Sequence, residues 1–204
     1  IEIIHIGGGD ITIGSHDDQI RRFVESIASW HLVLSDSSKN FLISRGHDPK
    51  KIFVTGSFSL PLTSNKRDEV EKHSVARYLG MADIHHYPWC VFSYTPETGE
   101  KATSFDDQLK SVSSCLHSLW KAGYFVWGSD SVTEPNSEEF NDSLRLLFAG
   151  TQMGYISSQY GSEVYFKLLE SSDLAVGNSS SFLIEAPFFG CHVFLIGNRQ
   201  SGRC

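Results

Sequence analysis

Short apolar runs alternate with amphipathic stretches along most of the chain. Runs that predict strands lie at residues 3–6, 31–34, 52–55, 89–94, 124–127, 155–156, 174–176 and 193–196. Between them, apolar residues recur at helical spacing around residues 20–28, 37–45, 105–120, 140–148 and 164–169. Strands that alternate with helices form parallel sheets covered by helices. The pattern therefore predicts an α/β fold of two Rossmann-like lobes with a cleft between them.

The chain changes character near Gly56–Pro61, where an apolar run gives way to the charged segment Asn65–Lys72. Such a segment is typical of a solvated helix face. We therefore expect one domain at residues 1–60 and a second at 61–204. The chain opens inside an apolar run without Met and closes without a final helix. We therefore expect a piece of a longer protein, with the first lobe incomplete and the second truncated at its end.

Charge and cysteine content narrow the classes of function. The net charge is -7 over 204 residues, which argues against nucleic acid or an anionic membrane as partner. No apolar run approaches the roughly 18–20 residues of a membrane-spanning helix. The four cysteines form no C-x-x-C pair, so no zinc site built on cysteine is expected. Cys90 and Cys191 lie in or beside apolar runs and are expected to be buried thiols, which suits the cytoplasm.

The segment from Leu174 to Pro187 carries the clearest sign of a ligand site. A buried strand ends at Gly177 and Asn178, the three serines Ser179, Ser180 and Ser181 follow, and a helix is expected to start there. The unpaired N–H groups of a helix start bind phosphate well. Glu185 is expected about one and a half turns into the helix, within reach of a sugar hydroxyl. One alternative is an ordinary capped helix. A serine nucleophile is a weaker alternative, because Ser181 occupies the position where a nucleophile elbow needs glycine.

A glycine-rich turn and a pair of acids form a second candidate site. Gly7-Gly8-Gly9-Asp10 follows the first strand, and Asp17-Asp18 precede the first helix. The two acids are either helix N-capping residues or a general base near the glycine turn. A metal site from His16, Asp17 and Asp10 has no recognised ligand spacing, so none is predicted.

Several motifs together resemble the hydrolysing UDP-N-acetylglucosamine 2-epimerases of the sialic-acid and legionaminic-acid pathways. They occur in the family's order: His5-Ile6-x-Gly8-Gly9-Asp10, Asp17-Asp18-x-Ile20-Arg21, Tyr94-x-Pro96-Glu97-Thr98, Gly177 to Pro187, and Gly197-Asn198-Arg199-Gln200-x-Gly202-Arg203. The resemblance implies the two-domain GT-B fold. It also implies removal of the C2 proton, loss of UDP to give a glycal, and hydration to N-acetylmannosamine, without a cofactor.

The resemblance also assigns roles to single residues. Ser179, Ser180 and Ser181 would hold the UDP phosphates, and Glu185 the ribose. Tyr165 occupies the position of an aromatic residue that stacks on uracil, with a core or rim aromatic as the alternative. Arg203 would neutralise phosphate charge, with Arg199 as the second candidate. The resemblance places Asp10, Asp17 and Thr95 at catalytic positions.

Two departures affect the catalytic motifs. Where the family has His-x-His-Gly-Gly-Glu, we take Gly8 to replace the second histidine, and Asp10 replaces glutamate. Where it has Thr-Tyr-His-Pro, Thr95 replaces histidine. The leading hypothesis is an epimerase with reduced or redirected activity on a UDP-sugar. The alternatives are a homologue that binds a UDP-sugar without turnover, and a GT-B glycosyltransferase. Homo-oligomer formation stays open.

Overall fold

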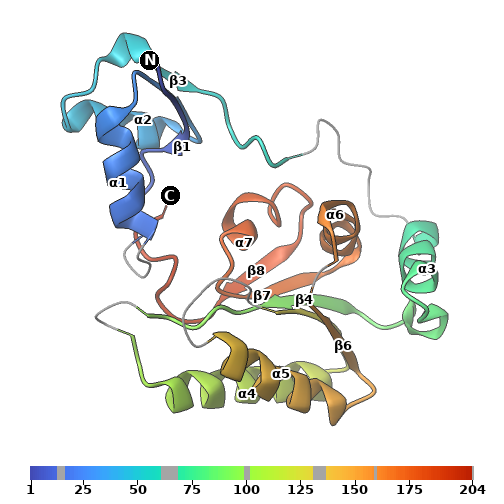
Figure 1. Ribbon diagram of the computed structural model, residues 1–204. Coiled ribbons are helices and arrows are strands. Elements are labelled where there is room, and N and C mark those ends of the chain that lie inside the picture. Colours follow the sequence, from blue (N-terminus) through green and yellow to red (C-terminus); the bar gives the residue numbers. More distant parts are fainter. Residues whose placement is uncertain (13–16, 61–68, 99–101, 131–136, 159, 204) are drawn as a thin grey trace. The chain divides into compact units, whose positions relative to one another are not determined.

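The computed structural model describes residues 1–12, 17–60, 69–98, 102–130, 137–158 and 160–203. The chain forms two compact units, drawn in Figure 1. Unit 1 comprises Ile1–Pro61, Glu97–Ala102 and Asn198–Cys204, and unit 2 comprises Leu62–Pro96 and Thr103–Gly197. The division into family lobes at residues 1–60 and 61–204 stays a prediction.

Unit 1 holds a parallel three-stranded sheet in the order β1-β2-β3. Its elements are β1 (Ile4–Gly8), α1 (Asp17–Ile27), β2 (Trp30–Val33), α2 (Asp36–Ser44), the 3-10 turn Pro49–Lys51 and β3 (Ile52–Val54). The hydroxyl of Ser35 caps α2 by accepting the N–H of Ser38 at 3.2 Å. Gly46 follows α2 with a positive φ of 92°, as expected at a helix end.

One face of the unit 1 sheet is bare in the described part of the chain. The register places Ile6 beside Leu32 and Leu32 beside Phe53, so these residues share one face. On that face Ile4, Ile6 and Phe53 are 59%, 57% and 47% exposed. Parallel sheets are normally covered on both faces, so this exposed apolar face is unusual. The apolar positions Ile20, Phe23 and Ile27, whose spacing predicted α1, are also exposed.

Unit 2 holds a parallel five-stranded sheet in the order β6-β5-β4-β7-β8. Its strands are β4 (Trp89–Ser93), β5 (Phe125–Ser129), β6 (Gly154–Ser157), β7 (Leu174–Gly177) and β8 (His192–Leu195). Its helices are α3 (Glu69–Tyr78), α4 (Phe105–Lys121), α5 (Ser137–Ala149), α6 (Ser162–Ser171) and α7 (Ser181–Ile184), with a 3-10 turn at Ala82–Ile84.

Helices cover both faces of the unit 2 sheet (Figure 1). On one face α3, α6 and α7 pack around Trp89 and Trp127. On the other, α4 and α5 pack around Phe92 and Phe140. The central strand β4 is buried on both sides, which explains its continuous apolar sequence. Cys90 and Cys191 are buried free thiols, as predicted.

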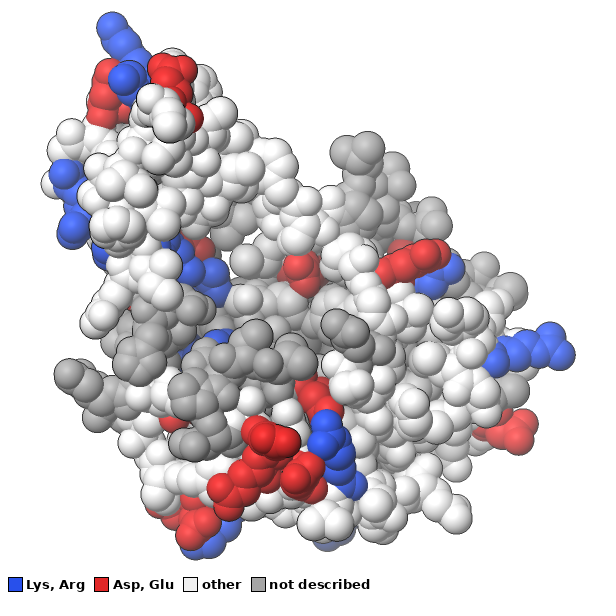
Figure 2. All heavy atoms as spheres, viewed as in Figure 1, with Lys and Arg blue, Asp and Glu red and all other residues white. Residues whose placement is uncertain are grey.

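Within the described ranges, no helix has the length and apolar character that crossing a bilayer demands. Figure 2 shows acidic and basic side chains interspersed on the face in view, where the described residues form no extended basic area.

Candidate functional site

The strand order of unit 2 creates a switch point between β4 and β7. The chain continues from β4 to β5 and β6 on one side, then returns to place β7 and β8 on the other side. Ser93 at the end of β4 pairs with Gly177 at the end of β7. Ligands of open α/β sheets bind at such switch points, beyond the carboxyl ends of the strands. The predicted serine turn starts at this point.

Asn178 ties the two strand ends together. Its side-chain Nδ2 donates to the Thr95 carbonyl and its Oδ1 accepts the Thr95 N–H, both at 2.7 Å. Asn178 is 1% exposed. Gly177 before it has a φ of 143°, and a Cβ there would lie 1.8 Å from the Ser93 carbonyl oxygen. Only glycine therefore fits this close strand approach.

The serine turn adopts a tighter conformation than the sequence suggested. α7 spans only Ser181–Ile184, and Glu185 lies at its C-cap rather than one and a half turns inside a helix. This prediction was wrong because Pro187 lies only three residues after Ile184. Proline disfavours helical geometry in the residue before it and lacks an N–H. A helix of a single turn contributes little dipole, so hydroxyls and N–H groups must supply most of any anion binding.

The hydrogen bonds of the turn leave two backbone donors available. The N–H groups of Phe182 and Leu183 donate to the carbonyls of Ser179 and Ser180, at 3.2 and 3.1 Å. The Ser181 N–H donates to Ser179 Oγ at 3.3 Å. The N–H groups of Ser179 and Ser180 have no acceptor among the described residues. Two adjacent N–H groups beside serine hydroxyls are suited to an anion.

Tyr165 on α6 lies beside the serine turn. Its hydroxyl and the Ser181 Oγ are hydrogen-bonded to each other. Burial raises the pKa of Tyr165, so the phenol stays protonated at neutral pH. Its side chain also lines a hollow of about 260 Å³ together with residues from the end of β5, the segment after β6 and the start of α6: Ser129, Ser158, Tyr160, Gly161 and Ser162.

In unit 1, the glycine turn places Asp10 in a buried ion pair. Asp10 is 5% exposed, and its Oδ2 accepts Arg203 Nε at 3.1 Å. Its Oδ1 accepts the Ser38 hydroxyl at 2.8 Å. Arg203 also donates from Nη1 to Gln200 Oε1 at 3.1 Å. The predicted catalytic Asp10 and the predicted phosphate ligand Arg203 are therefore partners of each other here.

Charged side chains along α1 hold the glycine turn in place. Glu25, 2% exposed, accepts the Gly9 N–H at 2.7 Å and pairs with Arg22 at 2.7 Å. Arg22 also pairs with Asp18 at 2.9 Å. Burial acts to raise the pKa of Asp18, but its hydrogen bonds with Arg22 and the Thr12 N–H outweigh that effect and lower it.

Arg21 adds a third guanidinium to this cluster. It donates to Thr12 Oγ1 at 2.9 Å and to the Asp10 carbonyl at 3.3 Å. Burial lowers the pKa of Arg21, and the charge of Arg203 lowers it further. The cluster therefore holds several cations close together, balanced by Asp10, Asp18 and Glu25.

One motif assignment is corrected by counting along the sequence. Counted from His5, the second histidine of His-x-His-Gly-Gly-Glu falls at Gly7, so Gly8 was the wrong position. A Cβ at Gly8 would lie 2.7 Å from His5 Nδ1, whereas one at Gly7 meets no atom within 4 Å. Gly7 has a positive φ of 79°, which a histidine rarely adopts. This turn is therefore built for glycine.

The other predicted site residues lie at the start of α1 and near the end of the chain. Asp17 begins α1, but its side chain and His16 lie outside the described residues. The N–H groups of Asn198 and Arg199 donate to Glu97 Oε1 at 2.6 and 3.0 Å, which joins two predicted motifs within unit 1. The described side chains contain no group of three His, Cys, Asp or Glu suited to a metal ion.

Sequence reasoning missed the roles of Asn178, Glu25 and Ser38. Asn178 had a local signal, because it follows a buried strand. Glu25 and Ser38 looked like ordinary helix residues, and only their burial against the glycine turn reveals them.

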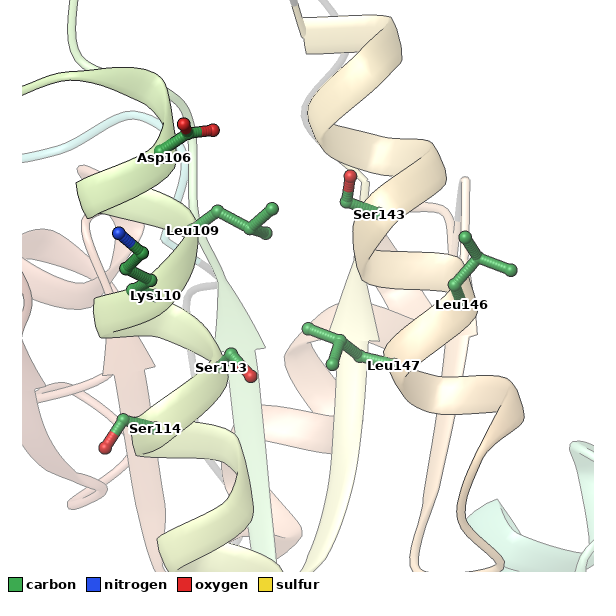
Figure 3. A pocket seen from close by; sticks show the side chains of 8 residues that line it. All are labelled: Asp106, Leu109, Lys110, Ser113, Ser114, Ser143, Leu146 and Leu147. Carbon is green, nitrogen blue, oxygen red and sulfur yellow. The ribbon is translucent and has the colours of Figure 1, made fainter.

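A further hollow lies away from these residues. It is a groove of about 650 Å³ between α4 and α5 (Figure 3). Leu109 and Leu147 point into it from opposite helices, with serines alongside. None of the predicted site residues lines it.

Comparison with known proteins decides the family. A model of the UDP-N-acetylglucosamine 2-epimerase family matches residues 1–204. The chain belongs to the UDP-N-acetylglucosamine 2-epimerase family. A GDP/UDP-N,N'-diacetylbacillosamine 2-epimerase (hydrolyzing) of Campylobacter jejuni is 27% identical over 209 residues, covering 100% of this chain and 52% of the relative. Polysialic acid biosynthesis protein P7 of Escherichia coli is 28% identical over 210 residues, covering 100% and 50%.

Solved structures of this epimerase family share the fold. The Neisseria meningitidis UDP-GlcNAc 2-epimerase bound to UDP-GlcNAc has a TM-score of 0.66 at 16% identity, covering 98% of this chain and 54% of that one. S. aureus MnaA, solved with UDP, has a TM-score of 0.70 at 13% identity, covering 98% and 52%. The predicted α/β, GT-B-like fold is thereby confirmed. The chain spans about half the length of the curated relatives it matches.

Proposed function

We propose that this protein is a hydrolysing epimerase that converts a UDP-N-acetylhexosamine into UDP and the free 2-epimeric sugar, of N-acetylmannosamine type. The observation that carries the proposal is the serine turn at the switch point of unit 2, in a chain of this family. Two relatives bear names with the word hydrolyzing, from Campylobacter jejuni and Legionella pneumophila. The name of the E. coli relative supports a role in sialic-acid-type synthesis.

The UDP diphosphate would bind at the serine turn. The N–H groups of Ser179 and Ser180 and the Ser181 hydroxyl supply neutral donors at one point. Solved family members hold UDP or UDP-GlcNAc. Glu185 directly follows α7 and is the candidate acceptor for ribose hydroxyls. We assign residues 61–204 to the UDP-binding lobe and residues 1–60 to the C-terminal part of the N-terminal lobe.

The reaction needs a base for the C2 proton and stabilisation of the departing diphosphate. Both carboxylate oxygens of Asp10 are engaged, by Ser38 and Arg203, so Asp10 would have to give up a partner before accepting a proton. Asp17, at the start of α1, is the other candidate base. General acid–base catalysis contributes roughly 10²–10⁴-fold, and stabilisation of the developing charge usually accelerates such reactions more.

A homologue that binds UDP-sugar without turnover is the second candidate function. Thr95 and Gly7 stand where the family pattern has imidazoles, and neither side chain can transfer a proton as histidine does. The Asn178 side chain holds the backbone N–H and carbonyl of Thr95. The Thr95 hydroxyl could therefore form hydrogen bonds to a ligand but would not act as an acid or base.

Calorimetric titration of the purified chain with UDP tests the nucleotide site. We expect binding that Ser180→Asp weakens at least tenfold, because a carboxylate beside the two N–H groups repels phosphate. Ser114→Asp, at an exposed position of α4, is the matched control and should bind UDP normally. A folded protein that does not bind UDP would contradict the proposal.

Turnover is tested with UDP-N-acetylglucosamine in D₂O. A hydrolysing epimerase releases UDP and a free sugar that carries deuterium at C2. UDP binding without release would favour the binding homologue. Formation of a UDP-linked epimer would contradict the hydrolysing reaction and show that the protein epimerises the sugar without releasing UDP.

A further inference from the structure

A chain of three hydroxyls runs from α6 to the serine turn. The Ser179 hydroxyl donates to Ser181 Oγ at 3.2 Å, and the Tyr165 hydroxyl is hydrogen-bonded to the same oxygen. Ser181 therefore lies between Tyr165 and Ser179, and its single proton can point to only one acceptor.

The direction of these bonds determines what Ser181 can do. If Tyr165 donates, Ser181 Oγ accepts from both neighbours and its own proton is free for a third group. The phenol of Tyr165 is protonated and can always donate. A phosphate oxygen is a far stronger acceptor than a phenol oxygen, so a bound diphosphate selects this arrangement.

We propose that Tyr165 is a positioning residue that turns the Ser181 hydroxyl into a donor toward the UDP diphosphate. This inference rests on the proposed function and deepens it. It assigns to the tyrosine hydroxyl a role that an aromatic ring stacked on uracil would not need. The ring can still line the hollow at the start of α6, because hydroxyl and ring act on different groups.

The burial of the pair supports this role. Both side chains are partly buried, and Tyr165 lies on a regular helix that packs against the core of unit 2. The tyrosine therefore presents its hydroxyl from a rigid element. Rigid placement of a donor reduces the conformational entropy lost when a ligand binds.

The test compares UDP and uridine binding by calorimetry in the wild type, Tyr165→Phe, Ser181→Ala and the double variant. Tyr165→Phe should weaken UDP binding about tenfold, because the Ser181 hydroxyl then loses the donor that fixes its orientation toward the charged diphosphate. Its uridine affinity should be unchanged, because uridine has no phosphate. The double variant should bind UDP no more weakly than Ser181→Ala, because both changes remove one interaction. Tyr124→Phe, on the opposite face of the sheet, is the matched control.

Four results would overturn the inference. If Tyr165→Phe binds UDP as tightly as the wild type, the Tyr165 hydroxyl does not contribute to binding and only its aromatic ring can. Equal losses for UDP and uridine would indicate a structural or stacking role. Additive losses in the double variant would show that the hydroxyls act independently. If the folded wild type does not bind UDP, the proposed function fails and the inference fails with it.

Discussion

Asn178 holds the backbone of Thr95 by both its donor and its acceptor, each at 2.7 Å. The amide side chain thereby continues the pattern of backbone hydrogen bonds between β4 and β7 by one more residue pair. The Asn178 N–H adds a bond to the Ser93 carbonyl at 3.0 Å. The position where the family pattern has histidine is therefore fixed by a residue 83 positions later.

Asn178→Ala should lower the free energy of unfolding by about 2–3 kcal/mol, because it leaves the partly buried N–H and carbonyl of Thr95 without their partner. Denaturant unfolding followed by tryptophan fluorescence measures this change. Gln152→Ala, at an exposed position, should alter stability by less than about 0.5 kcal/mol. Equal stability of the two variants would show that water replaces the lost bonds.

Gly177→Ala should prevent unit 2 from folding normally. The methyl group would lie 1.8 Å from the Ser93 carbonyl oxygen, so β4 and β7 would have to separate. Circular dichroism and soluble yield measure the effect. At Gly150 a methyl group would meet only ordinary contacts, at 3.4 and 3.8 Å, so Gly150→Ala is the matched control. A stable, soluble Gly177→Ala variant would contradict the strand geometry.

Arg203→Ala should destabilise unit 1 by about 3–5 kcal/mol, because it leaves the Asp10 carboxylate buried without its cation. Adding Asp10→Asn should recover part of the loss, because the unpaired charge is then removed. Chemical denaturation of both variants measures the two changes. If the double variant is no more stable than Arg203→Ala, the ion pair does not account for the loss.

Acid should destabilise unit 1 through His31 and His5. Burial lowers the pKa of His31 below 6.5, with further lowering from His47 and His5, against the opposing charge of Glu25. Burial also lowers the pKa of His5, although Glu25 acts to raise it. The unfolded chain therefore binds protons more readily than the folded one.

Above pH 6.5 these neutral histidines do not reduce the free energy of unfolding. Below it, the free energy of unfolding falls as the pH drops through their lower folded-state pKa values. Urea unfolding between about pH 7.5 and 5 should show the decline, and His31→Phe should reduce it. His86→Gln, at an exposed position, should leave the pH dependence unchanged. A wild-type profile that is flat across this range would contradict the prediction.

The bare sheet face of unit 1 should cause the 204-residue chain to associate. Ile6→Lys and Phe53→Lys place charges on that face and should reduce association, because exposed apolar area drives it. Sedimentation velocity at several concentrations measures the effect. Leu146→Lys, at a residue 76% exposed on α5, is the control with a similar change of charge. A monomeric wild type would contradict the prediction, because the exposed apolar face would then not drive association.

The sequence by itself determined the strands, most helices and the serine turn, because local hydrophobic period and turn chemistry encode them. It also carried the family motifs, which lie in short contiguous blocks. It misjudged the length of α7, where Pro187 outweighed the apolar pattern.

Only the tertiary structure decided which strand ends meet. Nothing near Ser93 in the sequence indicates that β4 pairs with β7 as well as with β5, which brings the serine turn beside Ser93. Strand order depends on pairings across the whole unit. The Asp10–Arg203 ion pair joins residues 193 positions apart. Periodicity reports which face of an element is apolar, but not which distant side chain it will meet, and those meetings define the site.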